Sequence, residues 1–405
     1  MGESKQGAIQ KSGERIMKQN TEDKRKPPFQ WNGLTKTDTN ALKGLCILVI
    51  VLHNFLHVFP TWNIENEFAF DAPKFTYFQD HFFSGLFNDF GLLFSYFGHY
   101  GVQMFVFLSA YGLYLSYKNK NIRYPGFVKD RVSKLYPTFF LAVLMVLAIN
   151  IAAAKSLNQP TLFLDAFLRL SFLSNLIPEK SFALVGPWWF YSMIVQFYLI
   201  FPLLRKWYDR YGVMPLILLS LLSCVLQILF NDQLALKGWL INTTVIGHIP
   251  VFALGLILAK RKNIPMPAWA FIGCCILFYI GNLTNFAWVF SRIWITVIIL
   301  YAYLFFKQFI RSGNGYAARA VLFLGNISMY MFAVNGFLRH PFVQLVLRYD
   351  NPFIKFACTV AFVLFVICIA LILKTAEKYI FGFTSSGGNK RLLFSRKRSV
   401  EVESR

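Results

Sequence analysis

Long apolar runs alternate with short polar segments from Ala41 to Lys374. A helix rises about 1.5 Å per residue, so a run of about 20 apolar residues crosses a hydrocarbon core of roughly 30 Å. One soluble core cannot bury so many runs of that length. The pattern predicts an all-α, polytopic integral membrane helix bundle with about ten transmembrane helices, near 41–59, 92–117, 135–154, 186–204, 212–230, 239–259, 268–284, 288–310, 321–338 and 352–374.

The apolar runs divide the chain into three parts. Residues 1–40 are polar and lack the short apolar stretch of a cleavable signal peptide, which predicts a cytoplasmic tail. Residues 41–375 form the predicted membrane domain, and 376–405 are expected to be a basic, disordered cytoplasmic tail near anionic headgroups. The short apolar segment 161–176 carries Asp165 and Arg169 and is predicted to lie at the membrane interface.

Composition supports a membrane protein and excludes one class of partner. Charged residues make up only 15% of the chain and hydrophobic residues 56%. The 41 Lys and Arg outnumber the 19 Asp and Glu, but they gather at alternate connectors and at both tails, as the positive-inside rule predicts. We therefore expect a multi-pass protein of the plasma or inner membrane, with both termini in the cytoplasm and no nucleic-acid partner. The six cysteines all lie in apolar runs and predict neither disulfides nor a metal site.

The first predicted span carries the strongest candidates for chemistry, because ionisable groups inside apolar helices are costly and are functional candidates by default. Lys43 lies at the cytoplasmic entrance, His53 about 15 Å further in, and His57 one turn beyond on the same face. A neutral imidazole suits general-base catalysis, although either histidine could instead hydrogen-bond a neighbouring helix. The pair could also bind a metal, but with no carboxylate or third ligand expected nearby we predict no metal site.

A second candidate is the pair Arg131 and Lys134, three residues apart at the cytoplasmic mouth of a span. Arg makes bidentate contacts to phosphate and Lys supplies a point charge, so the pair could bind the phosphates of a cytosolic donor. Ordinary topology-setting charge explains the same two residues, and without further context we favour that explanation.

Six short motifs occur in order along the chain, and together they resemble membrane acyltransferase family 3 over roughly residues 36–375. Proteins of this family move acyl groups from a cytosolic thioester to extracytoplasmic carbohydrate. The motifs are a basic residue with Gly and a later His (Lys43 to His53), Gly-Val-Gln-Met-Phe-Val-Phe-Leu-Ser (Gly101 to Ser109), Arg-x-x-basic with Leu-Tyr-Pro (Arg131 to Pro137), Trp through Gln-Phe-Tyr-Leu-Ile-Phe-Pro (Trp189 to Pro202), Pro-x-Phe-x-x-Gly (Pro250 to Gly255) and Gly-Asn-Ile-Ser-x-Tyr (Gly325 to Tyr330).

The resemblance implies roles for residues of these motifs. His53 would be the base that deprotonates an acceptor hydroxyl, with His57 as its rival. Lys43, Arg131 and Lys134 would bind the donor, an acyl-CoA with acetyl as the usual cargo, and no cofactor would be bound permanently. Residues expected to bind or orient the acceptor are Ser109, Gln196, Tyr198 and Asn335.

The sequence also departs from the family pattern. The family usually places eleven residues between its Arg and His positions, whereas the step from Lys43 to His53 is ten and turns His53 about 80° away. Asn54 is nearly in line with Lys43, and His57 is off by about 40°. Polar residues common in the family are replaced by Ile194, Val251 and Asn335. These changes indicate a divergent subgroup.

The predicted function is a membrane O-acyltransferase acting on a surface or exported polysaccharide, lipid-linked glycan or glycoconjugate. Aromatic residues of the first external loop, which could bind sugar rings or anchor the loop at the interface, fit this prediction: Trp62, Phe68, Phe70, Tyr77, Phe78, Phe82 and Phe83. The alternative is a carrier or lipid-linked glycan flippase in which the same polar residues line a substrate path. We find no convincing internal repeat of the kind that many transporters show.

Overall fold

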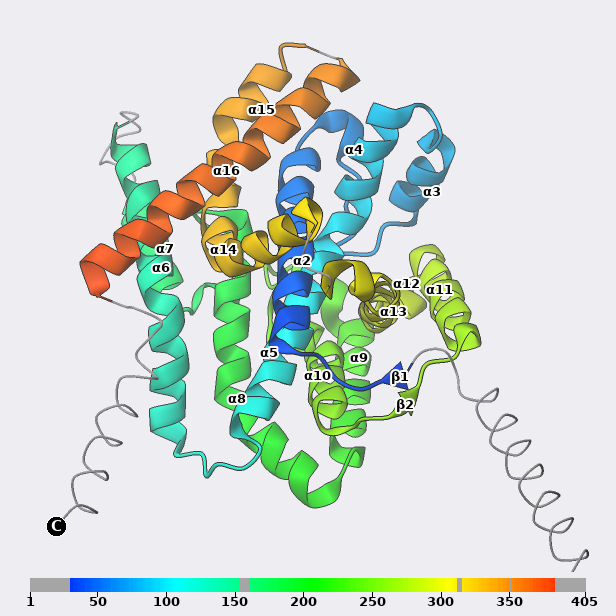
Figure 1. The fold of residues 1–405 in the computed structure, drawn as a ribbon. Coiled ribbons are helices and arrows are strands. Elements are labelled where there is room, and N and C mark those ends of the chain that lie inside the picture. Colours follow the sequence, from blue (N-terminus) through cyan, green and yellow to red (C-terminus); the bar gives the residue numbers. More distant parts are fainter. Residues whose placement is uncertain (1–29, 153–159, 312–314, 350, 383–405) are drawn as a thin grey trace, which may run out of the picture.

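The computed structural model describes residues 30–152, 160–311, 315–349 and 351–382. It is a bundle of helices with one short two-stranded sheet (Figure 1). The strands β1 (Gln30–Trp31) and β2 (Ile264–Pro265) pair antiparallel, with Trp31 opposite Ile264. The helices are α2 (Lys36–Leu56), α3 (Ala72–His81), α4 (Leu86–Phe97), α5 (Gly101–Tyr117), α6 (Tyr124–Ala152), α7 (Pro160–Leu170), α8 (Trp189–Tyr211), α9 (Met214–Ala235), α10 (Ile249–Lys260), α11 (Ala268–Leu283), α12 (Asn285–Trp288), α13 (Ser291–Arg311), α14 (Tyr316–Leu338), α15 (His340–Val346) and α16 (Pro352–Phe381), with short 3-10 turns η1 (Pro60–Trp62), η2 (Gly98–Tyr100), η3 (Ser174–Leu176), η4 (Gly186–Trp188), η5 (Ile241–Thr243) and η6 (Val245–Gly247).

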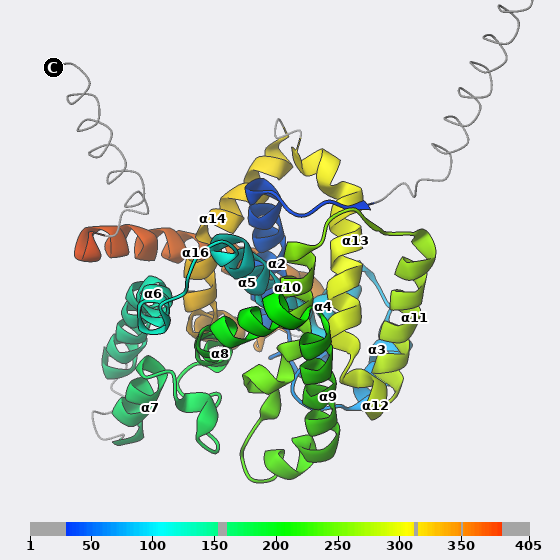
Figure 2. The same cartoon turned by 90° about the horizontal axis from the view of Figure 1, so that it is seen from below.

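Helix α2 lies at the centre of the bundle in both ribbon views (Figures 1 and 2) and packs against α14, α5, α4 and α16. It begins with a capping box in which Thr35 and Asp38 bond each other's backbone N–H groups. Glycines allow its closest contact, because Gly44 of α2 faces the Val321 carbonyl and Gly325 of α14 faces the Asn40 carbonyl. Of the two histidines in the first predicted span, His53 belongs to this central helix and His57 is its C-cap.

The membrane prediction is confirmed in its coarser form. Among the described residues, seven helices are long and apolar enough to cross a membrane, and α10 and α11 are shorter apolar helices. The second predicted span, 92–117, is interrupted at η2, where His99 lies between two glycines. The number of about ten spans and the placement of both termini in the cytoplasm stay predictions, and most of the two predicted tails lies outside the described residues.

Two element boundaries differ from the sequence prediction, and one predicted short helix is found. The predicted span 239–259 is an α-helix only from Ile249. Before it, residues Ile241–Thr243 form the 3-10 turn η5, and the Asn242 side-chain amide donates to the Phe68 carbonyl. Segment 161–176 is mostly the short helix α7, which is consistent with the predicted interfacial helix. Helix α16 continues past the predicted boundary at 375 to Phe381, because Glu377 is buried against Thr138 and the helix ends at Gly382 with a positive φ.

Two ends of the bundle can be distinguished around α2. We call the end that holds residues 57–85 the loop side; it includes α3 and lies at the C-terminal end of α2 (Figure 1). We call the opposite end, at the N-terminal end of α2, the basic side. It carries the cations Lys118, Lys120, Arg205 and Lys260, and the Arg205 guanidinium donates to the Lys118 and Lys120 carbonyls there.

Candidate active site

His53 and His57 lie at the loop-side end of α2, and each ring is oriented by a backbone carbonyl. Nδ1 of His53 lies 3.0 Å from the Ser95 carbonyl oxygen, and Nδ1 of His57 lies 2.7 Å from the His53 carbonyl oxygen. A carbonyl only accepts hydrogen bonds, so both Nδ1 atoms carry hydrogen. In the neutral form of either ring, the lone pair is therefore on Nε2, the atom that a general base would use.

A carboxylate pair, which the sequence did not predict near these rings, meets both Nε2 atoms. The Glu65 carboxylate lies 3.2 Å from Nε2 of His53 and 4.0 Å from Nε2 of His57, and a Glu67 oxygen lies 3.9 Å from Nε2 of His53. The expectation of no nearby carboxylate was therefore wrong. The chain turns back at η1, and the loop then passes over the end of α2. The buried Trp62 indole holds this turn by donating to the Asn88 side-chain oxygen.

The pKa values of the Glu65 and Glu67 carboxyl groups are shifted in opposite directions. Burial raises the pKa of Glu65, but the nearby His57 and His53 lower it more, so it lies well below its usual range. Burial and repulsion from Glu65 raise the pKa of Glu67 well above its ordinary value, and the Arg292 guanidinium offsets this only in part. The pKa of Glu65 is therefore shifted down and that of Glu67 up.

A cavity of about 350 Å³ opens on the loop side of the histidines. Its polar wall contains His57, Glu65, Glu67 and Arg339, and its apolar wall includes the aromatic rings of Phe68, Phe182 and Trp189. We call it the loop-side cavity. Acidic groups and aromatic faces in one cavity are suited to a polar ring-shaped ligand, because a ring can stack while its hydroxyl groups form hydrogen bonds.

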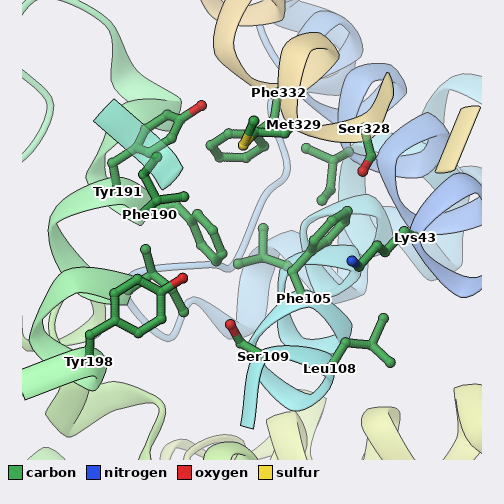
Figure 3. A pocket seen from close by; sticks show the side chains of 14 residues that line it. Lys43, Phe105, Leu108, Ser109, Phe190, Tyr191, Tyr198, Ser328, Met329 and Phe332 are labelled. Atoms are coloured by element: carbon green, nitrogen blue, oxygen red, sulfur yellow. The ribbon is translucent and has the colours of Figure 1, made fainter. Parts of the chain in front are cut away.

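A second cavity, of about 200 Å³, lies further toward the basic side between α2, α5, α8 and α14. Figure 3 shows the Lys43 side chain extending along one wall, with Ser109 and Tyr198 on the α5 and α8 walls. We call it the Lys43 cavity. The sequence grouped Ser109 and Tyr198 with the acceptor, whereas in the structure they line the same cavity as Lys43. The rest of the lining is largely apolar, including Ile50, Val102, Phe105, Leu108, Leu135, Phe190, Ile194 and Phe332.

His53 lies where these two cavities approach each other. A small space of about 10 Å³, close to the room of one water molecule, is lined by His53 and His99. It shares Ile50, Val102 and Phe332 with the Lys43 cavity. It also shares four residues with the loop-side cavity: Asn54, Glu67, Pro187 and Trp189. We call this space the His53 constriction. His57, by comparison, borders the loop-side cavity only.

The predicted pair Arg131 and Lys134 lies on α6 and converges on one carboxylate. Arg131 is 3.1 Å and Lys134 3.0 Å from Asp130, and Arg131 also donates to the Tyr117 hydroxyl at 2.8 Å. Neither side chain is among the described residues that line the Lys43 cavity, although their neighbour Leu135 is. Asp130 therefore neutralises part of the charge that the sequence suggested for a donor phosphate.

Gln196 and Asn335, the other two predicted acceptor residues, stabilise the elements around the site and do not form its centre. The Gln196 side-chain oxygen accepts from the Val245 N–H at 3.1 Å and so holds η6 against α8. Asn335 on α14 accepts from the Asn54 amide at 2.7 Å, which ties α14 to the turn of α2 that holds His53. Arg339, one turn further, donates to the Asn54 carbonyl and reaches the loop-side cavity.

Sequence patterns missed several residues of the site. His99 lies with its ring 5.4 Å from that of His53 but comes from η2, where the predicted span gave no sign of a break. Arg292 on α13 donates to the Glu67 carbonyl and to Gln227. Glu65 and Glu67 lie in a loop outside the predicted spans, where acidic residues are common. The available signal was the pair Glu65 and Glu67 in the loop that follows the two histidines of the first predicted span.

Comparison with known proteins identifies the family. The family model described as "Acyltransferase domain", that of acyltransferase family 3, matches residues 37–373. No curated protein and no solved structure matches the chain. The matched range begins at the start of α2 and ends within α16, so it covers the central helix, both cavities and the constriction between them. The chain belongs to membrane acyltransferase family 3.

Proposed function

We propose that the protein is a membrane O-acyltransferase that moves an acyl group, with acetyl as the expected cargo, from acyl-CoA on the basic side to a carbohydrate hydroxyl on the loop side. The observation that carries this proposal is the position of His53 at the constriction between two cavities of different character. In this proposal the basic side faces the cytoplasm, in keeping with the positive-inside rule, and the loop side faces outward across the plasma or inner membrane.

The Lys43 cavity has the character expected of a site for the donor's acyl arm. Its wall is mainly apolar, which suits the uncharged arm, while Lys43 supplies a cation for an anionic group of the donor. Lys120 and Lys206 on the basic side would attract the phosphates of the head group. Arg131 and Lys134 keep a supporting role, since Asp130 already pairs with both.

The chemistry requires one proton to move from the acceptor to the leaving sulfur. The acceptor hydroxyl transfers its proton to Nε2 of His53 while its oxygen attacks the thioester carbon. The carbon–sulfur bond then breaks, the new ester remains on the acceptor, and the departing thiolate takes the proton from His53. Glu65 and the Ser95 carbonyl stabilise the imidazolium that exists between these steps, so Glu65 acts as a positioning residue.

The loop-side cavity is the proposed acceptor site. Its volume of about 350 Å³ lies in the range of small-molecule pockets, and it accommodates a part of a glycan while the rest of the chain extends outward. Phe68, Phe182 and Trp189 offer ring faces, and Asn54 and Arg339 offer donors to hydroxyl oxygens. The aromatic residues Trp62, Phe75 and Phe78, by comparison, are buried and pack the loop itself.

Glu65→Gln is expected to lower the rate constant of acyl transfer about 10–100-fold, because a neutral amide cannot stabilise the His53 imidazolium. Transfer of radiolabelled acetyl from acetyl-CoA to a glycan fraction by the purified protein measures this effect. Glu65→Asp should restore part of the rate, and Asp80→Asn, which changes an exposed carboxylate of the same loop, should leave it unchanged. A Glu65→Gln rate equal to wild type would contradict the positioning role.

Lys43→Gln is expected to weaken coenzyme A binding about 10-fold, a loss of about 1.4 kcal/mol, because it removes the cation from the donor cavity. Isothermal titration of the detergent-purified protein with coenzyme A gives the dissociation constant. Lys237→Gln, at an exposed lysine outside the cavities, is the matched control. A wild-type protein that does not bind coenzyme A would favour a glycan carrier or flippase instead.

A further inference from the structure

The arrangement of His53, His57 and Glu65 has a second chemical meaning besides proton transfer. One possible ligand atom from each of the three residues lies within 4.8 Å of the other two. Among the described residues, this is the cluster of histidine, cysteine and acidic side chains that is close enough to hold a metal ion. Both Nδ1 atoms are bound to backbone carbonyls, so both Nε2 atoms are turned toward the same carboxylate. Histidine ligands of metal ions are oriented in this way, by a hydrogen bond at the second ring nitrogen.

A positive charge between the two Nε2 atoms and the Glu65 carboxylate oxygen would stabilise this arrangement. An Nε2 lone pair and a carboxylate oxygen repel each other at 3.2 Å unless a proton or a metal ion lies between them. With metal bonds of about 2.0–2.1 Å, tetrahedral ligands lie roughly 3.3–3.5 Å apart. The 3.2 Å between Glu65 and Nε2 of His53 is close to that spacing, and the 4.0 Å to Nε2 of His57 is wider, so His57 would move slightly inward to bind an ion.

We propose that His53, His57 and Glu65 form a binding site for a divalent transition-metal ion of the zinc class that enters from the loop side. Two histidines four residues apart on one helix face are the spacing that helical zinc sites use. Imidazole ligands favour zinc over calcium or magnesium, which prefer oxygen ligands alone. Glu67, 3.9 Å from Nε2 of His53, is placed to supply a fourth ligand or to hold a bound water.

Zinc binding has a defined consequence for activity, and this part of the inference rests on the proposed function. The ion takes the Nε2 lone pair of His53 that would accept the acceptor's proton, so zinc inhibits transfer. The loop-side cavity contains His57 and Glu65 in its wall, so an ion reaches them without passing the His53 constriction. Zinc and the acceptor therefore compete for the same cavity, and the inhibition weakens as acceptor concentration rises.

The test is titration of the metal-free, detergent-purified full-length protein with zinc chloride by calorimetry, and with cobalt chloride by visible absorption. Wild type should bind about one ion per chain and give the absorption of tetrahedral cobalt. His57→Ala and Glu65→Gln should each weaken binding by more than the roughly 10–100-fold that follows loss of an outer partner. His81→Ala is the matched control, because His81 lies in the same loop but is exposed and stacks on Tyr77.

The outcomes separate this proposal from the proposed function. Binding that His57→Ala abolishes and His81→Ala retains supports the site, whether or not acyl transfer is found. Absence of zinc and cobalt binding to wild type, or equal binding by wild type and His57→Ala, overturns it even if the protein transfers acetyl. Zinc inhibition is measured as the ratio of each variant's activity with and without zinc. Inhibition that persists unchanged in His57→Ala contradicts the proposed blocking of His53.

Discussion

His53→Ala should lower acyl transfer about 10²–10⁴-fold, which is the usual contribution of a general base. The ring is 2% exposed, lies at the constriction between the Lys43 cavity and the loop-side cavity, and has its Nδ1 bound to the Ser95 carbonyl. Removal of the ring therefore removes the group that accepts the hydroxyl proton, while coenzyme A binding in the Lys43 cavity should persist. The measurement is transfer of labelled acetyl to a glycan fraction, together with the dissociation constant of coenzyme A.

Two controls decide whether this loss is specific. His81→Ala changes an exposed histidine of the same side of the bundle and should keep wild-type transfer. His57→Ala tests the rival histidine, and its loss should be smaller, because His57 borders the loop-side cavity without reaching the constriction. Full activity of a His53→Ala, His57→Ala double variant would end the proposal. A larger loss in His57→Ala than in His53→Ala would make His57 the base.

Gly44→Ala should destabilise the protein by about 3 kcal/mol, the upper end of the usual cost of overpacking. An added Cβ at Gly44 would enter the Val321 carbonyl of α14, and backbone cannot move aside as a flexible side chain does. Helices α2 and α14 would have to separate, which displaces Lys43 and His53 from their cavities. The expected result is a lower unfolding temperature in detergent and a loss of transfer that exceeds the loss of folded protein.

Gly112→Ala is the matched control for this prediction. Gly112 lies in α5, also inside a helix, and an added Cβ would have open space around it. Alanine favours a helix over glycine by about 1 kcal/mol, so this variant should be as stable as wild type or more so. Equal unfolding temperatures for Gly44→Ala and Gly112→Ala would show that the contact between α2 and α14 is looser than described.

The helices could be predicted from the sequence because each apolar run is a local property. A run of sufficient length must pair its backbone groups within itself in lipid, so it becomes a helix wherever it lies in the bundle. The site residues Lys43 and His53 could be found for the same reason, as costly groups in such a run. Where a polar side chain bonded a distant segment, as the Asn242 amide does to the Phe68 carbonyl, the predicted helix gave way to a turn.

The remainder of the site depends on contacts between distant segments. Glu65 reaches His53 only because the loop turns at η1 and is held by Trp62, and no periodicity links the two residues. The pairing of Arg131 with its neighbour Asp130 depends on side-chain directions that spacing alone does not determine. Ser109 and Tyr198 lie on different helices, so only the packing of α5 against α8 places both in the Lys43 cavity.

The short spacing between Lys43 and His53 also has an explanation in the structure. A ten-residue step turns His53 about 80° away from Lys43, which would separate two residues required on one face. The two residues instead border different spaces at different heights along α2, and Ile50 lines both of these spaces. The departure from the family's spacing is therefore compatible with both residues taking part in the proposed transfer.

The most direct test of the account is an experimental structure of the protein with coenzyme A bound. The account predicts that the uncharged arm occupies the Lys43 cavity, with its sulfur nearest to His53 among the histidines and the nucleotide on the basic side. A sulfur atom that lies outside this cavity, or that is separated from His53 by the packed rings of Phe105 and Phe332, would contradict it.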